Sequence, residues 1–434
     1  MATGTIAGYN RLTRNNKHPG TTQIPFRSYR AIGRLFLVLV VGIHAFFLWN
    51  VRERIAKADP DFTAFYTAGT LLREGRGHEL YKAGAQEEVQ QQFATDSDIR
   101  RGPLPYIHPA FEALLFAPLS FLAYPAAFLV WEALNLGMLV AVSLLLRSRL
   151  GSLRPVPPLE WMLALLAFFP VFTNFLQGQD AILLLLLLVL SFRALDSNSP
   201  FAAGCWLGLG VFRYHLVVPL ALILGWRHRR MFSGFAASGS AAVLLSFAIV
   251  GWQAALLYPA YVLHWTTMPF FGKMPPSLMP NLLGLITGWP FAEATRGTLQ
   301  VGVLAVSVLL LMFIAIMRNR ANGRNFLNLT FACAVITAVL VGYNTGSYDL
   351  SLLVLPLALV ADYCLGGSVG LPEATRRLVL PAVPLLVSPL WFLLWRQWER
   401  MNLMAIFLLW WLYAIGRVTL PVAEKPGGSV APLT

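Results

Sequence analysis

Apolar residues along this chain gather in blocks, which are separated by short runs of charged residues, glycine or proline. A helix needs about 20 residues to cross the hydrocarbon core of a bilayer, and many of the blocks approach that length. The pattern predicts helices near residues 35–49, 126–146, 161–176, 180–193, 201–212, 216–226, 234–251, 299–317, 326–342, 350–364, 379–395 and 401–415. We therefore expect an all-α polytopic membrane protein with about twelve transmembrane helices.

Two of the predicted segments, 201–212 and 216–226, are short for a full crossing. Broken membrane segments are tolerated where they line a cavity instead of facing lipid, because their free backbone groups need polar partners. We expect these two segments to line such a cavity.

Composition agrees with lipid as the main solvent, since 57% of the residues are hydrophobic and 12% are charged. A net charge of +13 would indicate nucleic acid binding in a soluble protein. Here the lysines and arginines lie between the apolar blocks, where cytoplasmic loops collect positive charge. We therefore expect membrane lipids, and no nucleic acid, as partners.

The distribution of basic residues predicts the orientation of the chain. Residues 1–34 contain six lysines and arginines and no acid, so we expect them in the cytoplasm, followed by a retained first helix. If the twelve helices alternate, four further basic clusters lie on the same side. They are Arg147/Arg149/Arg154, Arg227/Arg229/Arg230, Arg318/Arg320/Arg324 and Arg376/Arg377.

The predicted organisation is a basic cytoplasmic N-terminus (1–34), a membrane domain (35–415) and a cytoplasmic tail (416–434). Two long stretches, 50–125 and 252–298, are expected on the extracytoplasmic side, and they carry most of the polar residues. The second contains several prolines among aromatic residues and is predicted to be a structured loop. No fixed-period repeat or separate soluble domain is present in the sequence.

Several kinds of chemistry have no motif here. Cys205, Cys333 and Cys364 lie inside apolar segments without paired spacing, so neither disulfides nor a zinc site are indicated. The sequence has no Walker motif, dinucleotide fingerprint or Gly-x-Ser-x-Gly motif. ATP-driven transport and soluble-cofactor chemistry therefore have no basis in the sequence. The sequence does not reveal whether the protein requires a metal.

The first extracytoplasmic stretch is expected to contain helices over Pro60–Arg73 and Leu80–Phe93 and an interfacial segment, Phe111–Leu122. Asp59 is well suited to be an N-cap, with Pro60 as the first helical residue. Asp61 would then follow at the second position, where the helix dipole favours the ionised carboxylate that a general base requires. Alternatively, Asp61 only complements the dipole.

Other candidates lie in nearby loops. Tyr66 follows Asp61 on the same predicted helix and could contact substrate, or it could be an ordinary interfacial aromatic residue. His108 could hydrogen-bond a phosphate or sugar hydroxyl, or have no such role. Gln179 and Asp180 join two apolar helices at the outer membrane edge, where acids are functional candidates, although Asp180 could simply cap the following helix.

The remaining candidates are polar or charged residues at the ends of apolar runs. Arg213, between two short runs, would suit a phosphate partner if it is buried, or its stem could reach the membrane interface. Tyr348 and Asp349 end a polar turn and would project into an outward cavity, although turn residues are common in such a loop.

Residues 61–69, Asp-Phe-Thr-Ala-Phe-Tyr-Thr-Ala-Gly, resemble the Asp-Phe-x-x-(aromatic)-Tyr-x-Ala-Gly stretch that follows the first helix in glycosyltransferase family 87. Further resemblances follow in the family's order, so that roughly residues 35–365 are covered. They are Tyr106–Pro118, the pair Trp131 and Asn135, Gly178-Gln179-Asp180, Gly208–Pro219, Asn281-Leu282-Leu283-Gly284 and Tyr348–Pro356.

The resemblance implies a C-type glycosyltransferase (GT-C) fold, in which the large first extracytoplasmic loop of a helical bundle supplies a catalytic carboxylate. It implies an inverting hexosyltransferase of a bacterial-type cytoplasmic membrane, which takes mannose from a polyprenyl monophosphate carrier. The acceptor would be an extracytoplasmic glycan or glycolipid. By position, the resemblance gives Asp61 the role of general base.

The resemblance also implies roles for other candidates. Arg213 stands where many members have lysine, and it keeps a cation for the leaving phosphate. Tyr348 and Asp349 would position sugar or acceptor, and His108 would contact the phosphate. The sequence departs from the family at Pro109-Ala110, where a Pro-Pro pair is common.

Two other classes of protein fit the hydrophobic pattern. A secondary transporter or a lipid or glycolipid flippase also has many helices, but it should place ionisable residues near the bilayer midplane. Here these residues are predicted mainly in the outer loops. A non-catalytic scaffold for envelope assembly would leave the Asp61 carboxylate dispensable.

Overall fold

A computed structural model describes residues 26–94, 103–226, 228–267, 278–287, 293–317, 324–366, 372–387 and 402–419. Every regular element in these ranges is helical, which confirms the all-α prediction. The helices are α1 (Phe26–Ala56), α2 (Phe62–Arg73), α3 (Ala83–Phe93), α4 (Ala110–Phe116), α5 (Tyr124–Arg149), α6 (Pro158–Ala167), α7 (Phe169–Gln177), α8 (Ala181–Asp196), α9 (Pro200–Leu209), α10 (Tyr214–Gly225), α11 (Arg229–Thr267), α12 (Leu282–Thr287), α13 (Glu293–Met317), α14 (Arg324–Val341), α15 (Val354–Leu365), α16 (Pro372–Val379), α17 (Val383–Leu386) and α19 (Met404–Thr419). Short 3-10 turns include η2 (Leu119–Phe121), η4 (Gly210–Arg213) and η7 (Tyr348–Leu353).

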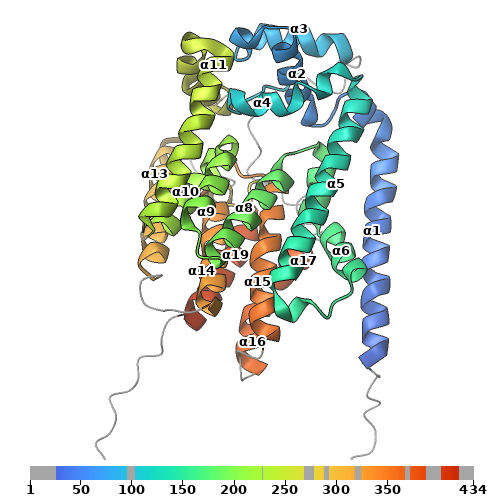
Figure 1. The fold of residues 1–434 in the computed structure, drawn as a ribbon, viewed down its shortest axis with the longest axis vertical. Helices are drawn as coiled ribbons and strands as arrows, with labels where there is room; N and C mark the ends of the chain where they lie inside the picture. The colour runs from blue at the N-terminus through green and yellow to red at the C-terminus, as the bar shows by residue number, and fades with distance from the viewer. Residues whose placement is uncertain are drawn as a thin grey trace, which may run out of the picture.

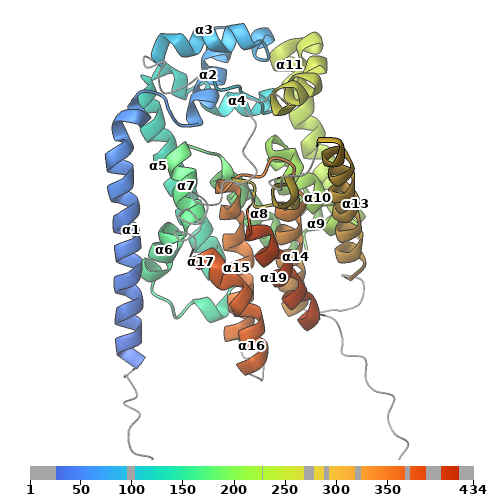
Figure 2. The same cartoon turned by 180° about the vertical axis from the view of Figure 1, so that it is seen from behind.

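The long helices form a bundle, and α2, α3 and α4 form a cap across one end of it (Figure 1). Seen from behind, α1 runs along one edge of the bundle and α13 along the other (Figure 2). The start of α1 and helix α16 lie at the end opposite the cap. The stretch predicted as the first large loop therefore lies at the far end of the molecule from the start of α1.

Basic residues gather at the end of the bundle away from the cap. Arg30 at the start of α1 forms an ion pair with Glu160 of α6, at 3.3 Å. Arg149, the last residue of α5, pairs with Asp196, the last residue of α8. This charge distribution agrees with the predicted orientation, although Arg318 and Arg320 of the predicted cluster Arg318/Arg320/Arg324, and Arg227 of another, lie outside the described residues.

In the part of the chain that the structure describes, six helical segments are long and apolar enough to cross a membrane. A seventh is formed by α6 and α7 if that pair, bent by 68°, counts as one span. The predicted count of twelve stays a prediction, because residues 388–395 of the predicted segment 379–395 lie outside the described residues.

Helices α9 and α10 belong to one candidate span by length and composition, but they double back. The Phe201 backbone touches Gly234, and a Cβ atom built on Gly225 would lie 3.4 Å from Phe232 Cβ. Both ends of the segment thus contact the start of α11. A straight helix of 26 residues would hold its ends about 39 Å apart. The two short runs therefore form a re-entrant hairpin. None of their residues lines the cavity of the candidate active site described below, so their predicted role in lining a cavity stays a prediction.

Helix α11 is longer than predicted. The predicted segment 234–251 ends where Gly251 has φ +80° and ψ 163°, a conformation open to glycine and strained for other residues. Beyond this kink the chain is helical to Thr267, so the first part of the stretch 252–298 is a helix and not an irregular loop.

The start of α2 corrects one prediction. Asp61, and not Asp59, is its N-cap residue. Ala58 has φ +65°, and the Asp59 N–H bonds the Arg54 carbonyl at 3.1 Å, so Asp59 belongs to the turn that ends α1. The Asp59 side chain also pairs with Arg54 at 2.9 Å. The chain reversal after α1 thus uses the residues that the sequence pattern assigned to the helix start.

Gly69 explains how α2 lies so close to α4. A Cβ atom at this position would lie 2.5 Å from the carbonyl carbon of Phe116, so only glycine fits without moving the backbone. The predicted interfacial segment, Phe111–Leu122, forms α4 and η2, with Phe116 buried and Phe121 75% exposed. One face of the segment packs into the cap, and the other leaves apolar side chains outside.

Close packing of α9 on α11 leads to a stability prediction. We expect Gly204→Ala to lower the free energy of unfolding by about 1–3 kcal/mol, because the new methyl group would collide with the Met231 carbonyl oxygen. The matched control is Gly137→Ala on α5, where nothing lies within 4 Å. Thermal unfolding in detergent, followed by tryptophan fluorescence, tests the difference. Equal midpoints for the two variants would contradict the packing described.

Candidate active site

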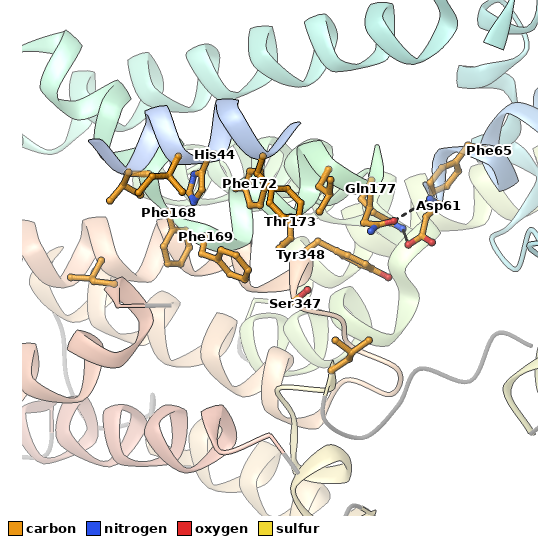
Figure 3. A pocket seen from close by; sticks show the side chains of 18 of the residues that line it. His44, Asp61, Phe65, Phe168, Phe169, Phe172, Thr173, Gln177, Ser347 and Tyr348 are labelled. Atoms are coloured by element: carbon orange, nitrogen blue, oxygen red, sulfur yellow. Dashed lines mark hydrogen bonds between the residues drawn. The ribbon is translucent and has the colours of Figure 1, made fainter. Parts of the chain in front are cut away.

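A cavity of about 1070 Å³ lies between α1, the loop before α4, the α6/α7 pair and the turn before η7. Figure 3 shows Asp61 and Gln177 at one end of this cavity and His44, Phe168 and Phe169 at the other. Tyr348 and Ser347 lie between the two ends. The cavity thus has a polar end beside the start of α2 and a longer apolar end along α1.

Asp61 is half-buried at the polar end, where one glutamine bonds its carboxylate and another bonds its backbone. The Gln179 amide donates a hydrogen bond to Asp61 Oδ2 at 2.7 Å, and the Asp61 backbone N–H donates to Gln177 Oε1 at 3.3 Å. These contacts fix the start of α2 against the turn between α7 and α8. The carboxylate faces the cavity from the first residue of the cap.

The turn that carries these glutamines is itself tightly held. Gly178 has φ +63°, and a Cβ atom there would lie 2.6 Å from Phe62 Cβ. The Trp131 indole N–H donates to the Gly178 carbonyl at 3.0 Å, and the Asn135 amide donates to the Gln179 carbonyl at 3.3 Å. The Trp131 and Asn135 pair on α5 therefore orients the turn that orients Asp61.

A buried ion cluster lies next to this turn. Arg213, at the apex of the α9/α10 hairpin, donates from Nε to Asp180 Oδ1 and from Nη1 to Asp349 Oδ1, both at 2.8 Å. Its Nη2 also bonds Asp180 and Gln179. Arg213 is 3% exposed, and both aspartates are 0% exposed. The arginine is therefore buried and does not extend to the membrane interface.

This cluster places Asp180 and Asp349 in roles other than local capping. Asp180 occupies the N-cap position of α8 but makes no side-chain capping bond, because its carboxylate faces Arg213. Asp349 accepts the Gly346 N–H at 2.7 Å as well as the arginine.

Tyr348 connects the ion cluster to the cavity. Its ring lies 5.1 Å from the Arg213 guanidinium carbon, a cation–π distance, and its side chain lines the cavity. The preceding turn is anchored by Asn281, whose amide donates to the Gly342 carbonyl at 2.6 Å. The Gly284 N–H in turn donates to Asn281 Oδ1 at 2.7 Å.

His108 approaches the same cluster from the cap. Its loop is fixed by two tyrosines, since the Tyr81 and Tyr258 hydroxyls donate to the carbonyls of residues 108 and 107, both at 3.0 Å. His108 Nδ1 lies 2.8 Å from Glu112 Oε2 and 3.8 Å from Asp180 Oδ2. Burial lowers the pKa of His108 to about 4 against the opposing pull of Asp180. Burial also raises the pKa of the Glu112 carboxyl, and the Asp180 charge adds to that rise.

The structure brings most of the predicted site residues together but not Tyr66. Asp61, His108, Gln179 and Tyr348 line the cavity, whereas the Tyr66 hydroxyl donates to the Leu122 carbonyl at 2.8 Å inside the cap. The neighbouring Phe65 lines the cavity instead, as Figure 3 shows. Tyr66 therefore lies on the other face of α2.

Sequence reasoning did not single out Glu112, which is 0% exposed and joins the cluster. Its spacing of four from His108 was a usable signal, because residues that far apart share one face once a helix begins between them. It also did not predict His44, whose Nδ1 lies 3.1 Å from the Leu166 carbonyl at the bend between α6 and α7. Pro170 was the signal that could have found it, because proline has no N–H to donate to the carbonyl four residues earlier, which is that of Leu166.

The sequence model of glycosyltransferase family 87 matches residues 106–342, more than half of the chain. A curated relative, "Polyprenol-phosphate-mannose-dependent alpha-(1-2)-phosphatidylinositol mannoside mannosyltransferase" of Mycobacterium tuberculosis, is 28% identical over 178 residues. That alignment covers 38% of this chain and 41% of the relative, so the chain matches less than half of the relative's length. No solved structure matches the chain significantly.

The buried ion cluster predicts a strong asymmetry between two substitutions. We expect Arg213→Met to cost about 3–5 kcal/mol of stability, because two buried carboxylates lose their counter-charge. Arg213→Lys keeps the charge and should cost less. Arg193→Met, which removes an exposed bond to Ser148, is the control and should change little.

Thermal unfolding in one detergent compares the variants. Adding Asp349→Asn to Arg213→Met should restore part of the lost stability, because it removes one of the two unpaired charges. If Arg213→Met and the wild type had the same unfolding midpoint, the ion cluster would not stabilise the fold.

Proposed function

We propose, because this chain belongs to glycosyltransferase family 87, that it moves a hexose from a polyprenyl monophosphate carrier to a glycan or glycolipid acceptor. The observation that carries this proposal is the Asp61 carboxylate at the polar end of a cavity whose other end is apolar. The name of the mycobacterial relative specifies a polyprenol-phosphate-mannose donor, which supports mannose as the sugar. Its phosphatidylinositol mannoside acceptor supports a glycolipid acceptor here.

The shape of the cavity suits a donor with a sugar phosphate head and a prenyl tail. Its apolar end is lined by residues of α1, including Phe36, Val40 and Phe47, and by Phe168 and Phe172 at the α6/α7 bend. Burying apolar chain against such side chains is favourable by about 0.8 kcal/mol per methylene group when the chain leaves water. A membrane-embedded donor is already out of water, so the apolar wall mainly orients it.

The polar end suits the reacting sugar. Asp61, Gln177, Gln179 and Tyr348 present a carboxylate, two amides and a hydroxyl to a small region of the cavity. Carboxylate and amide groups hydrogen-bond sugar hydroxyls, and aromatic faces pack against sugar rings. We therefore assign substrate contacts to Gln179 and Tyr348, and to His108 beside them.

In the proposed mechanism an acceptor hydroxyl attacks the anomeric carbon of the donor sugar, and Asp61 takes the hydroxyl proton. The bond from the anomeric carbon to the phosphate oxygen breaks, so the configuration is inverted and polyprenyl phosphate leaves. The hydrogen bond from Gln179 to Asp61 Oδ2 fixes the direction of the carboxylate that would take the proton.

Arg213 has a modified role in this mechanism. Its donors already bond Asp180, Asp349 and Gln179, so direct contact with the leaving phosphate would require exchange of one of these bonds. We propose that Arg213 acts chiefly as a positioning residue, which holds Gln179 and the Tyr348 ring in place. We also propose that the cap faces the extracytoplasmic side, opposite the basic end of the bundle.

The base assignment makes a direct prediction. Asp61→Asn should lower the rate of mannose transfer by about 10²–10⁴-fold, the usual contribution of a general base, and should leave folding intact. The matched control is Asp59→Asn, two residues away, whose carboxylate pairs with Arg54 and should be dispensable for transfer. Purified protein in lipid nanodiscs, with radiolabelled polyprenyl-phosphate mannose and a bacterial lipid extract, provides the assay.

Three results would change the proposal. Equal activity of Asp61→Asn and wild type would keep the transferase and refute Asp61 as its base. Activity only with another polyprenyl-phosphate sugar would replace mannose. No transfer with any polyprenyl-phosphate sugar would favour a transporter or flippase of glycolipids.

The donor site predicts a dependence on prenyl chain length. Ala164→Trp places a large side chain in the apolar end of the cavity and should raise KM for a long-chain donor at least about tenfold, with a smaller effect on a two-prenyl analogue. The control is Leu159→Trp, on the same helix but 67% exposed. A rise in KM that is equal for long and short donors would place the prenyl chain elsewhere.

A further inference from the structure

Three side chains converge beside the cavity, and the proposed reaction assigns a substrate contact to only one of them, His108. His108, Glu112 and Asp180 each present one ligand atom, and these atoms all lie within 4.8 Å of one another. His108 Nδ1 is 2.8 Å from Glu112 Oε2 and 3.8 Å from Asp180 Oδ2. Ligand atoms around one cation at about 2.1 Å are separated by similar distances.

Two carboxylate oxygens of this group lack hydrogen-bond partners although they are buried. They are Asp180 Oδ2 and Glu112 Oε1, and both carboxyl side chains are fully buried. His108 Nδ1 makes no well-directed hydrogen bond, although Glu112 Oε2 lies 2.8 Å away. The arginine uses Asp180 Oδ1 and leaves Oδ2 directed at His108. Buried polar atoms are almost always satisfied, so this group needs either a cation or a proton shared between its carboxyl groups.

The charge around the cavity favours a cation. Asp61, Asp180 and Asp349 supply carboxylates, and Arg213 is the cation that contacts two of them among the described residues. A sugar phosphate donor would bring a further negative charge to this region. A single arginine therefore does not balance the site once the donor is bound.

We propose that His108, Glu112 and Asp180 bind one divalent cation of the Mn²⁺ type beside the cavity. Two carboxylates and an imidazole are a ligand set that suits Mn²⁺. Glu112 and Asp180 close the inner side, whereas His108 lines the cavity next to Asp61, so open coordination positions face the cavity. This part of the proposal rests on the proposed function: a phosphate oxygen of the donor would take one of these positions. The cation would then stabilise the leaving phosphate, which Arg213 is not free to bind.

Binding of Mn²⁺ alone tests the site without any transfer assay. Protein washed with EDTA and placed in nanodiscs of zwitterionic lipid is titrated with Mn²⁺, and free Mn²⁺ is measured by electron paramagnetic resonance. We expect one bound Mn²⁺ per chain. We expect Glu112→Gln and His108→Ala each to weaken binding at least about tenfold, the smallest change usual even for outer-sphere partners of a metal.

Matched variants separate ligand loss from other effects. Glu87→Gln and His78→Ala remove the same groups from exposed positions in the cap and should bind Mn²⁺ like the wild type. Mn²⁺ should also raise the melting temperature of the wild type but not that of Glu112→Gln. This difference would show that Glu112→Gln folds but has lost the cation site. No binding in the millimolar range, or equal binding by wild type and both ligand variants, would overturn the proposal in favour of a shared proton.

Transfer activity distinguishes failure of the cation site from failure of the proposed function. Loss of transfer in EDTA and its recovery with Mn²⁺ would support both. Full transfer in EDTA would overturn the catalytic part of the cation proposal while the glycosyltransferase stands. Stoichiometric Mn²⁺ binding that depends on Glu112, in a protein inactive with all donors, would support the site and count against the proposed reaction.

Discussion

The Arg213 guanidinium is the contact on which the organisation of the site depends. It bonds Asp180 between α7 and α8 and Asp349 in η7, and it carries these bonds from the apex of a hairpin that enters the bundle and turns back. A buried guanidinium without partners would be far too costly, so the hairpin apex can occupy this depth only with a carboxylate beside it. The same bonds fix Gln179, and Gln179 fixes Asp61. The position of the proposed base in the cap thus follows from an ion cluster in the bundle.

Close backbone contacts give this arrangement its precision. Gly69 lets α2 lie against α4, and Gly178 lets the α7/α8 turn lie against Phe62 at the start of α2. Trp131 and Asn135 hold the same turn from α5. The first contact holds the cap together, the second joins the cap to the bundle, and the third holds the joining turn within the bundle, so the cavity has walls from both. Such a cavity can present a membrane-bound donor and a water-borne or lipid acceptor to one carboxylate.

The sequence alone predicted the all-helical class, the cap helices over Pro60–Arg73 and Leu80–Phe93 to within a few residues, and the two short runs around Arg213. These features follow from hydrophobic periodicity and from charge in an apolar context, which are local signals. It misplaced the N-cap of α2, because Pro60 favours Asp59 as the local cap, whereas the actual helix start depends on how α1 ends. The helix beyond Gly251 was read as a loop, because a glycine and nearby prolines look the same at a kink and at a helix end.

Most of the predicted site residues converge in the structure, but their pairing was not predictable. Arg213 was expected to contact a phosphate, whereas its partners are carboxylates more than thirty positions away in either direction along the chain. Tyr66 was grouped with Asp61 by proximity in sequence, but a step of five residues along a helix points to a different face. Glu112 carries no motif of its own, and only the approach of His108 and Asp180 makes it notable.

The spacing of the ion cluster along the chain bears on how the protein is made. Asp180 and Arg213 are 33 residues apart, whereas Asp349 comes 136 residues after the arginine. During synthesis the first aspartate and the arginine enter the membrane as a pair whose charges cancel, so the hairpin can insert before the last third of the chain exists. Asp349 arrives at a bundle already seated in lipid, and its carboxylate closes around a guanidinium that has so far had one counter-charge. The order of the residues along the chain thus keeps the arginine from facing hydrocarbon alone at any stage of biogenesis.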